Sequence, residues 1–535
     1  SAFLIEGRSA YMDILIRGGR VLDGNGNPWF RADVGIEGKR IAGVGDLSGV
    51  KADKVIDASG LVVAPGFIDI HNHSDVSLLA DGRAESMVHQ GVTTLVAGNC
   101  GMSPFPLVGF SKENAERNYA RDFGLRVDWS TQGEYEGRLR RQGVSVNVGL
   151  YVGHGTVREA VMGHEDREPT SGELGEMRRH VEDAMGAGCF GLSAGLGYAP
   201  GLYASTGEIV DLCKIAARHG GLYAPHVRSA QTFPRNLNEA IEVGERAGLP
   251  VQMAHIGSST CQRLNWGNAE KVTLGIVDAA RARGVDFTTD IYPYVVSGGE
   301  LTMYVPKWAQ EGGKAEMMRR LADPETRARM RPEVGEMLRH RDWGQLLLYA
   351  LKSERYKRHA GKTVKKIAEE EGRDPMDVAY DIILAEDSNV PFMGLFGQEE
   401  DIRALMRHGA VMIGSDGTAE PGNRGAMVHP RSFGTFPRVI GHYVREGVLT
   451  LSEAVHKVTG MPAWRLGLRD RGVIKPGAVA DVTVFDPERV RDDYTITSPP
   501  GFPDGIPHVI VNGVPTVEEG RHTGALAGEI LHRGA

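Results

Sequence analysis

Short apolar runs alternate with amphipathic segments through the middle of the chain. Apolar residues at helical spacing occupy the connections, and two of these connections begin with a capping-box pattern, at Thr170 and at Ser205. Strands that alternate with helices predict parallel pairing. The pattern therefore predicts an α/β fold, with a (β/α)8 TIM-like barrel favoured over a doubly wound open sheet. The runs that we expect to form the barrel strands are 67–71, 93–100, 144–153, 189–196, 222–227, 251–256, 286–292 and 411–416.

The two ends of the chain have a different pattern, in which short strand-like runs are separated by Gly, Asn and Pro. Such runs predict hairpins. Neither end is large enough to bury both faces of a sheet alone. We therefore expect residues 12–65 and 471–535 to form the two halves of one small β-sandwich, rather than two unrelated tails, and residues 66–470 to form the barrel. The runs are 13–17, 20–23, 32–36, 40–44, 472–477, 481–485 and 508–512.

One connection is much longer than the others and lies between the seventh and eighth predicted strands. Residues at about 300–395 contain charged, helix-like pieces, among them 314–322 and 363–371. These pieces predict a helical insertion. The insertion is either a lid over the barrel mouth or a solvated segment that only adds stability.

Composition and charge exclude several classes of protein. Sixty-one Lys and Arg against 69 Asp and Glu give a net charge of −8, which argues against binding to nucleic acid or to an anionic membrane. The longest apolar run, 346–351, is far shorter than the ~20 residues of a membrane helix. Four cysteines in 535 residues make no disulfide framework, so we expect a reducing, cytoplasmic compartment. Ile5–Arg8 reads like a vector protease site, so we expect residues 1–11 to be a tag remnant.

Polar residues of metal-binding types follow the predicted strands at one end only. His71 and His73 follow the first strand and, two positions apart in extended chain, point to the same side. In a parallel barrel the carboxyl ends of all strands surround one mouth. The alternative is that each residue is an independent, hydrogen-bonded strand terminus. The six residues in question are His71, His73, Cys100, His226, His255 and Asp416.

Imidazole and thiolate ligands favour zinc. Six protein ligands exceed one tetrahedral site, so a bridged pair of ions with Cys100 as the bridge is one arrangement; in the other, Cys100 is a buried apolar residue. Asp416 can either hold the ion or act as a general base and acid. Because zinc brings the pKa of water to ~7, this set of residues fits hydrolytic attack on a carbonyl.

Several motifs, spread over nearly the whole chain, resemble one family. With them the sequence is similar to the amidohydrolase superfamily, in particular to the N-acyl-D-amino-acid deacylases, or D-aminoacylases. The resemblance implies a barrel with a β-sandwich from both termini, and zinc as cofactor. The motifs are Pro65–His73, Gly98–Gly101, Gly153–Gly155, Gly191–Tyr198, Asp290–Tyr294, Gly414–Gly417, His429–Arg431 and Ile474–Asp481.

The resemblance also implies roles for single residues. Cys100, His226 and His255 resemble the tightly held zinc site, whereas His71 and His73 with Asp416 resemble a second site that is weaker or empty. The implied reaction is removal of the acyl group from an N-acyl-D-amino acid or a related small amide. In that reaction zinc-activated hydroxide attacks the carbonyl.

The resemblance implies one catalytic residue and three substrate-binding residues. Asp416 resembles the general base and acid, and Arg431 resembles an arginine that binds the substrate α-carboxylate through its bidentate fork. Tyr292 resembles a residue near the scissile carbonyl, and Tyr198 resembles a residue lining the pocket, where packing against the fourth strand is the alternative.

Two glycines depart from the family pattern. Gly257 stands where a lysine is expected and Gly298 where a serine is expected, and both of those residues would contact the substrate carboxylate. Because both replacements open space, we expect a substrate that lacks a carboxylate there or is larger. Two alternatives to hydrolysis stay open: condensation or cyclisation of an amide at the same metal site, and a binding scaffold without catalysis.

Overall fold

Parallel strands form the centre of the protein, as the alternating pattern predicts. The structure is a computed structural model that describes residues 3–4, 11–229, 232–257, 266–339, 341–388, 390–422, 427–492, 495–496 and 501–534. The expected tag remnant at 1–11 lies largely outside these residues. Within them, one parallel sheet has six strands and another has three.

The six-stranded sheet has the order β10-β11-β12-β13-β14-β18, and the three-stranded sheet has the order β7-β8-β9. A parallel bridge between Asn72 and Gly417 joins the chain just after β7 to the chain just after β18. The strands are β7 (Phe67–Asp69), β8 (Val92–Ala97), β9 (Asn147–Leu150), β10 (Val152–Gly153), β11 (Gly191–Gly195), β12 (Leu222–His226), β13 (Val251–Met253), β14 (Phe287–Ile291) and β18 (Val411–Ile413).

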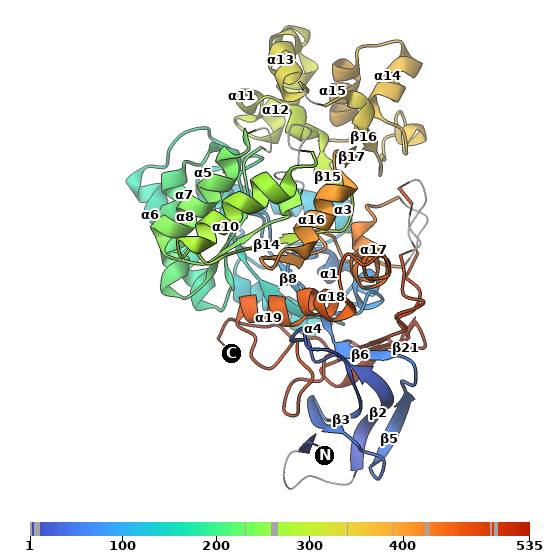
Figure 1. The fold of residues 1–535 in the computed structure, drawn as a ribbon. Coiled ribbons are helices and arrows are strands. Elements are labelled where there is room, and N and C mark those ends of the chain that lie inside the picture. The colour runs from blue at the N-terminus through green and yellow to red at the C-terminus, as the bar shows by residue number, and fades with distance from the viewer. Residues whose placement is uncertain are drawn as a thin grey trace.

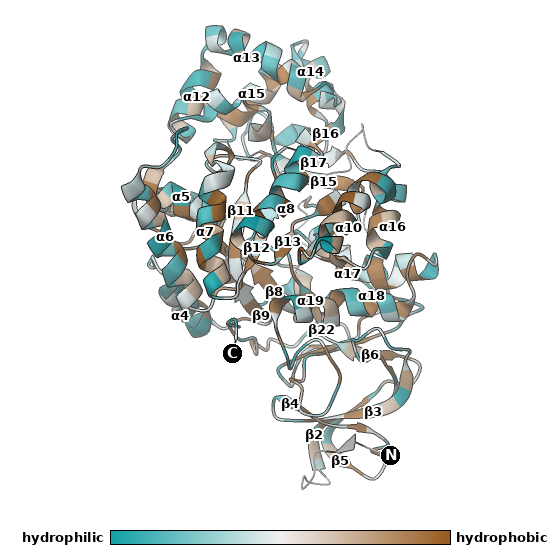
Figure 2. Ribbon diagram, turned by 60° about the vertical axis from the view of Figure 1, so that its left-hand side comes forward, coloured by the Kyte–Doolittle hydropathy of each residue, from teal (hydrophilic) through white to brown (hydrophobic). Residues whose placement is uncertain are grey.

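Amphipathic helices cover these strands. Thr170 caps α6 (Ser171–Gly186) and Ser205 caps α7 (Thr206–Arg218), each by accepting a hydrogen bond from a backbone N–H three residues later. Both predicted N-caps are therefore confirmed, but the full capping box is present only at Thr170, because the side chain of Glu208 contacts His154 and Arg158 instead. Figure 2 shows apolar strands such as β12 and β13 inside a layer of helices whose outer faces are hydrophilic. None of the helices in the described ranges is long and apolar enough to cross a bilayer.

Strands from both ends of the chain share one ten-stranded sheet, which lies at the bottom of Figure 1. Its order is β1-β4-β3-β2-β6-β19-β20-β21-β22, with β5 paired to β2. The two ends meet where β6 pairs antiparallel with β19. The strands are β1 (Phe3–Leu4), β2 (Tyr11–Val21), β3 (Phe30–Glu37), β4 (Arg40–Gly45), β5 (Lys51–Asp57), β6 (Val62–Pro65), β19 (Val482–Phe485), β20 (His508–Val511), β21 (Val514–Glu518) and β22 (Arg521–His522).

Two details of this sheet differ from the predicted runs. The runs 13–17 and 20–23 form one strand, β2, because Gly18 at φ 72° absorbs a register shift between Ile16 and Gly19. The predicted strand at 472–477 is wrong. Pro476 has no N–H to donate to a ladder, and Gly477 turns the chain at φ 87°, so this segment makes loop contacts instead.

The insertion has a hydrophobic core of its own, which extends from Leu301 to Phe396. It lies at the top of Figure 1, at the end of the molecule opposite the ten-stranded sheet. Besides the predicted helices it contains an antiparallel sheet of order β15-β17-β16, which the helix-like pattern did not predict. Its elements are β15 (Val296–Glu300), α11 (Lys307–Gln310), α12 (Lys314–Ala322), α13 (Pro324–Met337), β16 (Leu346–Leu348), α14 (Val364–Glu371), α15 (Pro375–Ala385) and β17 (Pro391–Leu395).

The separate core of the insertion makes its stability testable. Ile383 of α15 is fully buried in that core. Replacing it with alanine (Ile383→Ala) should lower the free energy of unfolding by about 2–5 kcal/mol, because the truncation leaves a cavity. Denaturant unfolding, with limited proteolysis to locate the first cleavage within the insertion, measures this. Glu354→Ala at an exposed position should stay within about 0.5 kcal/mol. Equal unfolding curves for the two variants would contradict the assignment of a separate core.

Candidate metal centre

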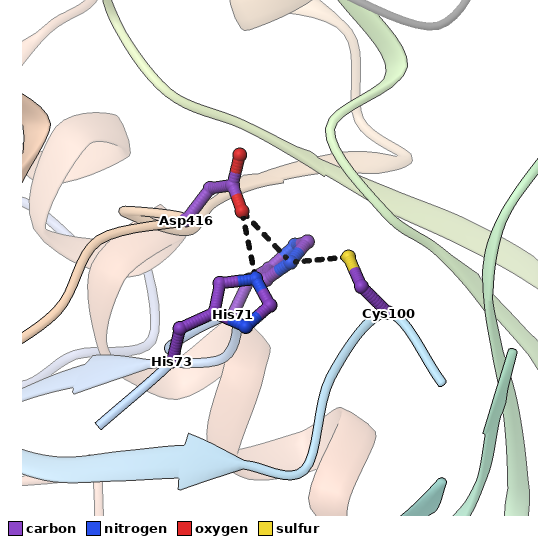
Figure 3. Close-up of side chains that lie close together, drawn as sticks. All are labelled: His71, His73, Cys100 and Asp416. Carbon is purple, nitrogen blue, oxygen red and sulfur yellow. Dashed lines mark hydrogen bonds and ion pairs between the residues drawn. The ribbon is translucent and has the colours of Figure 1, made fainter. Parts of the chain in front are cut away.

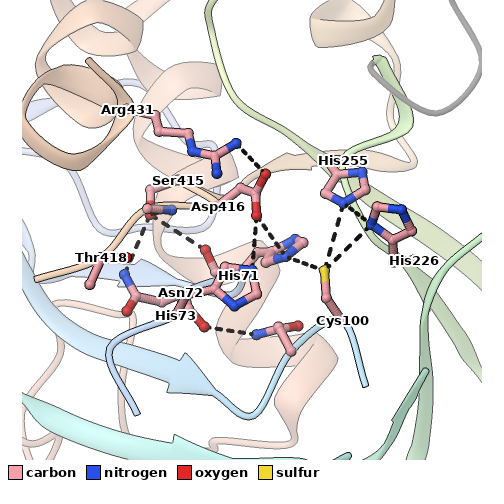
Figure 4. Close-up of polar contacts among 12 residues, drawn as sticks. His71, Asn72, His73, Cys100, His226, His255, Ser415, Asp416, Thr418 and Arg431 are labelled. Carbon is pink, nitrogen blue, oxygen red and sulfur yellow. Dashed lines mark hydrogen bonds and ion pairs between the residues drawn. The ribbon is translucent and has the colours of Figure 1, made fainter. Parts of the chain in front are cut away.

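The six predicted metal-binding residues converge at the carboxyl ends of the parallel strands. One group places single ligand atoms of His71, His73, Cys100 and Asp416 within 4.8 Å of one another, as Figure 3 shows. A second group does the same with Cys100, His226 and His255. Cys100 belongs to both groups, so its sulfur lies between them (Figure 4).

Left-handed backbone brings three of these side chains inward. Cys100, His255 and Asp416 have φ values of 53°, 32° and 51°, and each stands two or three residues beyond the end of its strand. A residue with a side chain adopts this conformation at a cost of roughly 1–3 kcal/mol, and such residues cluster at functional sites. The local sequence helps at the cysteine, because Gly98 at φ 78° begins the turn.

Backbone hydrogen bonds join the first and last strand ends directly beneath the centre. The N–H of Asp416 donates to the carbonyl of His71 at 2.8 Å, and the N–H of His73 donates to the carbonyl of Gly417 at 2.8 Å. Buried Asp69 accepts from the N–H of Ser415 at 2.8 Å and so strengthens the same junction. These contacts hold His71, His73 and Asp416 in one register.

The sulfur of Cys100 is the centre of the arrangement. It lies 3.4 Å from Nε2 of His71, 3.7 Å from Nδ1 of His226 and 3.7 Å from Nε2 of His255. The last two nitrogens lie 2.9 Å apart. Burial by itself would raise the pKa of the Cys100 thiol. The charge of His71 and the hydrogen bonds from His226 and His255 outweigh burial and hold that pKa well below its usual range, so a thiolate forms readily.

The two carboxylate oxygens of Asp416 contact different residues. Its Oδ1 lies 3.0 Å from Nε2 of His73 and 3.3 Å from Nε2 of His71, and its Oδ2 accepts from Nη1 of Arg431 at 2.5 Å. Burial opposes ionisation, but the charges of Arg431 and His71 outweigh it and hold the pKa of Asp416 well below its usual range. Burial likewise opposes the charge of His73, and its bond to Asp416 raises its pKa to about 9.

Arg431 occupies the space that the sequence suggested was open at Gly298. A Cβ atom on Gly298 would lie 2.8 Å from Nη2 of Arg431, and the guanidinium carbon lies 5.3 Å from the ring centroid of Tyr292. The expectation of free space at Gly298 is therefore wrong. At Gly257 a Cβ would meet Cδ1 of Ile291 at 3.1 Å, so the wall there is apolar.

The two predicted substrate-binding tyrosines have different surroundings. The hydroxyl of Tyr198 donates to the carbonyl of Cys100 at 2.5 Å, and its ring packs edge-on against His226 with centroids 5.1 Å apart. This contact supports the turn that carries the cysteine. Tyr292 is buried and lines a mostly apolar pocket beside His255, whose other lining residues include Gly257, Ile291, Phe396 and Leu405 together with polar Ser297, Gln398 and Asp401.

Sequence reasoning gave no role to Asp290, although it belongs to a quoted motif. Its Oδ1 accepts from Nδ1 of His71 at 3.0 Å and from the backbone N–H of His255 at 2.9 Å. A usable signal was present, because a carboxylate inside a buried apolar strand needs partners. Asp69 at the end of β7 carried the same signal.

Comparison with known proteins agrees with this geometry. The sequence model described as "Amidohydrolase family" matches residues 54–517. D-aminoacylase of Alcaligenes xylosoxydans xylosoxydans is 36% identical over 525 residues, which is 98% of each chain. A solved structure from a study of the binuclear metal centre in D-aminoacylase has a TM-score of 0.80 at 34% identity and covers 98% of this chain and 100% of the other.

A second solved structure is that of N-acyl-D-glutamate deacylase from Bordetella bronchiseptica, in complex with zinc and a phosphonate mimic of the tetrahedral intermediate. Its TM-score is 0.81 at 31% identity, and the match covers 98% of this chain and 100% of that one. The relatives are thus similar over their whole length, and the α/β fold described above is shared with them.

The turn at Gly98 should tolerate no side chain. A Cβ there would clash with the carbonyl oxygen of Tyr151, and φ is 78°. Gly98→Ala should therefore lower the free energy of unfolding by at least about 1–2 kcal/mol through the backbone alone. Gly133→Ala, in the first turn of α4 (Gln132–Gln142), where a Cβ meets no neighbour, should be neutral or stabilising by up to about 1 kcal/mol. Denaturant unfolding of both variants is the measurement, and equal stability would contradict the strained turn.

Proposed function

This chain belongs to the amidohydrolase family, and we propose that it is a zinc-dependent deacylase that removes the acyl group from an N-acyl-D-amino acid. The observation that carries the proposal is the sulfur of Cys100 surrounded by imidazole nitrogens of His71, His226 and His255. The relatives described above are named for the same reaction and are similar over nearly the whole chain.

The donor set fits zinc. With zinc–sulfur bonds of about 2.3 Å and zinc–nitrogen bonds of about 2.0–2.1 Å, a tetrahedral site has sulfur–nitrogen edges of roughly 3.5 Å. The distances of 3.7 Å from the sulfur of Cys100 to His226 and His255 agree with such an edge. We therefore propose that these three residues hold the tightly bound ion. A second, weaker ion would lie among His71, His73 and Asp416, with Cys100 as the bridge.

The finer architecture is part of the proposal. We propose that the two parallel sheets belong to one closed (β/α)8 barrel, since the bridge between Asn72 and Gly417 connects the first strand end to the last. We also propose that the ten-stranded sheet from the two ends folds as the small β-sandwich. These assignments place the metal centre at the barrel mouth, where barrel enzymes have their active sites.

Bound zinc supplies a Lewis acid that polarises a carbonyl oxygen and makes hydroxide available near neutral pH. Asp416 transfers the proton from the water to the leaving group. Because its pKa lies well below the usual range, it is ionised, and it takes the proton of the attacking water through the oxygen that faces His73. It then gives this proton to the leaving nitrogen as the amide C–N bond breaks. The products are a carboxylic acid and a free amino acid.

Arg431 is positioned to bind the substrate α-carboxylate. Its guanidinium lies between Asp416 and the face of Tyr292, so a carboxylate beside it would bring the neighbouring amide toward the metal centre. The pocket beside Gly257 favours an uncharged substituent over an anionic one, because most of its lining is apolar and the carboxylate of Asp401, which also lines it, would repel an anion. N-acyl-D-amino acids with apolar side chains are therefore the proposed substrates.

A substrate screen with mass detection tests the function. Zinc-loaded protein should hydrolyse N-acetyl-D-leucine or N-acetyl-D-methionine with gain of one water, and it should act more slowly on N-acetyl-D-glutamate and on L-isomers. Loss of water from a substrate would indicate condensation instead. Failure to cleave any N-acyl-D-amino acid with zinc bound would refute the proposed substrate class.

Two variants should separate metal binding from proton transfer. Cys100→Ala removes the shared sulfur and should abolish tight zinc binding together with activity. Asp416→Asn should retain the zinc held by Cys100, His226 and His255 but lower kcat by about 10²–10⁴-fold, because the general base is lost. Elemental analysis and steady-state kinetics measure the two effects. Wild-type kcat in either variant would contradict the mechanism.

The guanidinium of Arg431 packs against Gly298, and this contact allows substrate binding to be tested. Arg431→Ala should lower kcat/KM for N-acyl-D-amino acids by roughly 10–150-fold, the equivalent of about 1.5–3 kcal/mol for a hydrogen bond to a charged group. Gly298→Ala displaces the guanidinium, so it should also lower kcat/KM, through a higher KM, but by a smaller factor. The loss should be smaller for the matching carboxamides, which have no carboxylate for Arg431 to bind, and what remains reports the contact of Arg431 with Asp416. Gly335→Ala in α13, where a Cβ meets no neighbour, is the matched control.

A further inference from the structure

We infer that Asp290 is a positioning residue that sets both halves of the metal centre at once. The inference rests on the proposed function, since it concerns how the chain prepares its ligands for zinc. Asp290 lies in β14, is buried, and touches one residue from each of the two ligand groups. It stands close to the metal centre without being one of the six candidate ligands.

The first contact determines which nitrogen of His71 is available. Oδ1 of Asp290 lies 3.0 Å from Nδ1 of His71. A carboxylate can only accept, so Nδ1 carries the hydrogen and donates it. Nε2 of His71 is then the nitrogen left to bind a metal ion, which takes the place of the Nε2 proton; it faces the sulfur of Cys100, 3.4 Å away, and Oδ1 of Asp416, 3.3 Å away. Asp290 thus selects the tautomer that can bind a metal ion.

The second contact holds the strained turn at His255. The same Oδ1 of Asp290 accepts from the backbone N–H of His255 at 2.9 Å, where φ is 32°. Nε2 of His255 lies 3.7 Å from the sulfur of Cys100. The rings of His71 and His255 consequently stack with centroids 5.1 Å apart, and both direct Nε2 at one sulfur. One carboxylate oxygen therefore sets the spacing of two ligands from different strands.

Asp290 is itself held in place. Its other oxygen accepts from Nε2 of Gln252 at 3.2 Å, and Oε1 of Gln252 accepts from the hydroxyl of Thr288 at 2.6 Å. Gly414 permits the close approach, because a Cβ there would lie 2.7 Å from Cβ of His71 and 3.2 Å from Cβ of Asp290. Both oxygens of Asp290 are thus occupied by donors, which an amide of the same shape could not match.

Metal affinity is the direct test. Asp290→Asn keeps the side-chain shape. Whichever way the amide is oriented, its NH2 group faces either the N–H of His71 or the NH2 of Gln252, so one hydrogen bond is replaced by a contact between two donors. Zinc affinity, measured by competition with a chromophoric chelator, should fall by about 10–100-fold. The cobalt-loaded variant should show a weaker sulfur-to-cobalt absorption band than the wild type. Gln252→Leu should give a smaller loss in the same direction, so the test does not depend on one variant folding.

Asp33→Asn is the matched control. Asp33 also accepts from two backbone N–H groups, those of Gly18 and Leu47, but it lies in the terminal sheet. This variant should bind zinc as the wild type does. Unfolding of the metal-free proteins shows whether Asp290→Asn has only a structural effect: an unchanged unfolding midpoint with weakened zinc supports positioning.

The outcomes separate this inference from the proposed function. If the wild type binds zinc and Asp290→Asn binds it equally well, the positioning role is wrong and the deacylase proposal stands. If zinc binding falls as expected while the wild type cleaves no N-acyl-D-amino acid, the positioning role stands and the substrate class is wrong. If the wild type binds no zinc, both are overturned.

Discussion

Cys100, His255 and Asp416 leave their strands through left-handed backbone, and the position of every other ligand is set relative to these three turns. A strand that simply continued would send successive side chains to opposite faces. The turns instead bring side chains from separate strands to one point. The unfavourable conformations persist because neighbours hold them: Tyr198 bonds the carbonyl of Cys100, Asp290 the N–H of His255, and the carbonyl of His71 the N–H of Asp416.

The insertion contributes to the substrate end of the site through its first strand. Nε2–H of His429 donates to the carbonyl of Val296 in β15 at 3.1 Å, and Nδ1 of His429 accepts from the N–H of Arg431 at 3.2 Å. Burial and the charge of Arg431 hold the pKa of His429 well below its usual range, so the ring stays neutral and can do both. Gly298, also in β15, then provides the surface on which the guanidinium rests. The parallel strands carry the six candidate ligands, and the insertion provides the surface against which Arg431 packs.

The sequence predicted which runs contain the parallel strands and all six candidate ligands, because alternation of apolar runs and the position of polar residues after them are local signals. It placed several strand ends too late, since β8, β13 and β18 stop two or three residues before Cys100, His255 and Asp416, and the predicted run 144–153 forms two strands, β9 and β10. It did not predict the continuous β2, whose register shift at Gly18 depends on a partner strand. Asp290 was missed for a similar reason: its role follows from β14 lying beside β18 and β13, which no local pattern encodes.

The contact between Arg431 and Gly298 likewise could not be predicted from the sequence. Gly298 looked like a position that had lost a substrate contact, since sequence alone shows the missing side chain and not what fills its place. The folded chain puts the guanidinium of Arg431 there. The contact connects β15 with the segment after β18, and it depends on how the long insertion returns to the parallel sheet.

The joining of β6 to β19 constrains how the protein is made. Val482 pairs with Pro65 across about 420 residues, and at ~5–20 residues per second the ribosome needs roughly 20–80 s to synthesise that interval. During that time β6 can pair with β2 on one side while its other edge stays open. An open edge is a template for pairing with other chains. Nascent chains of this protein therefore carry an unprotected strand until β19 has emerged, which makes the interval between the synthesis of β6 and of β19 a period of exposure to aggregation and to chaperones.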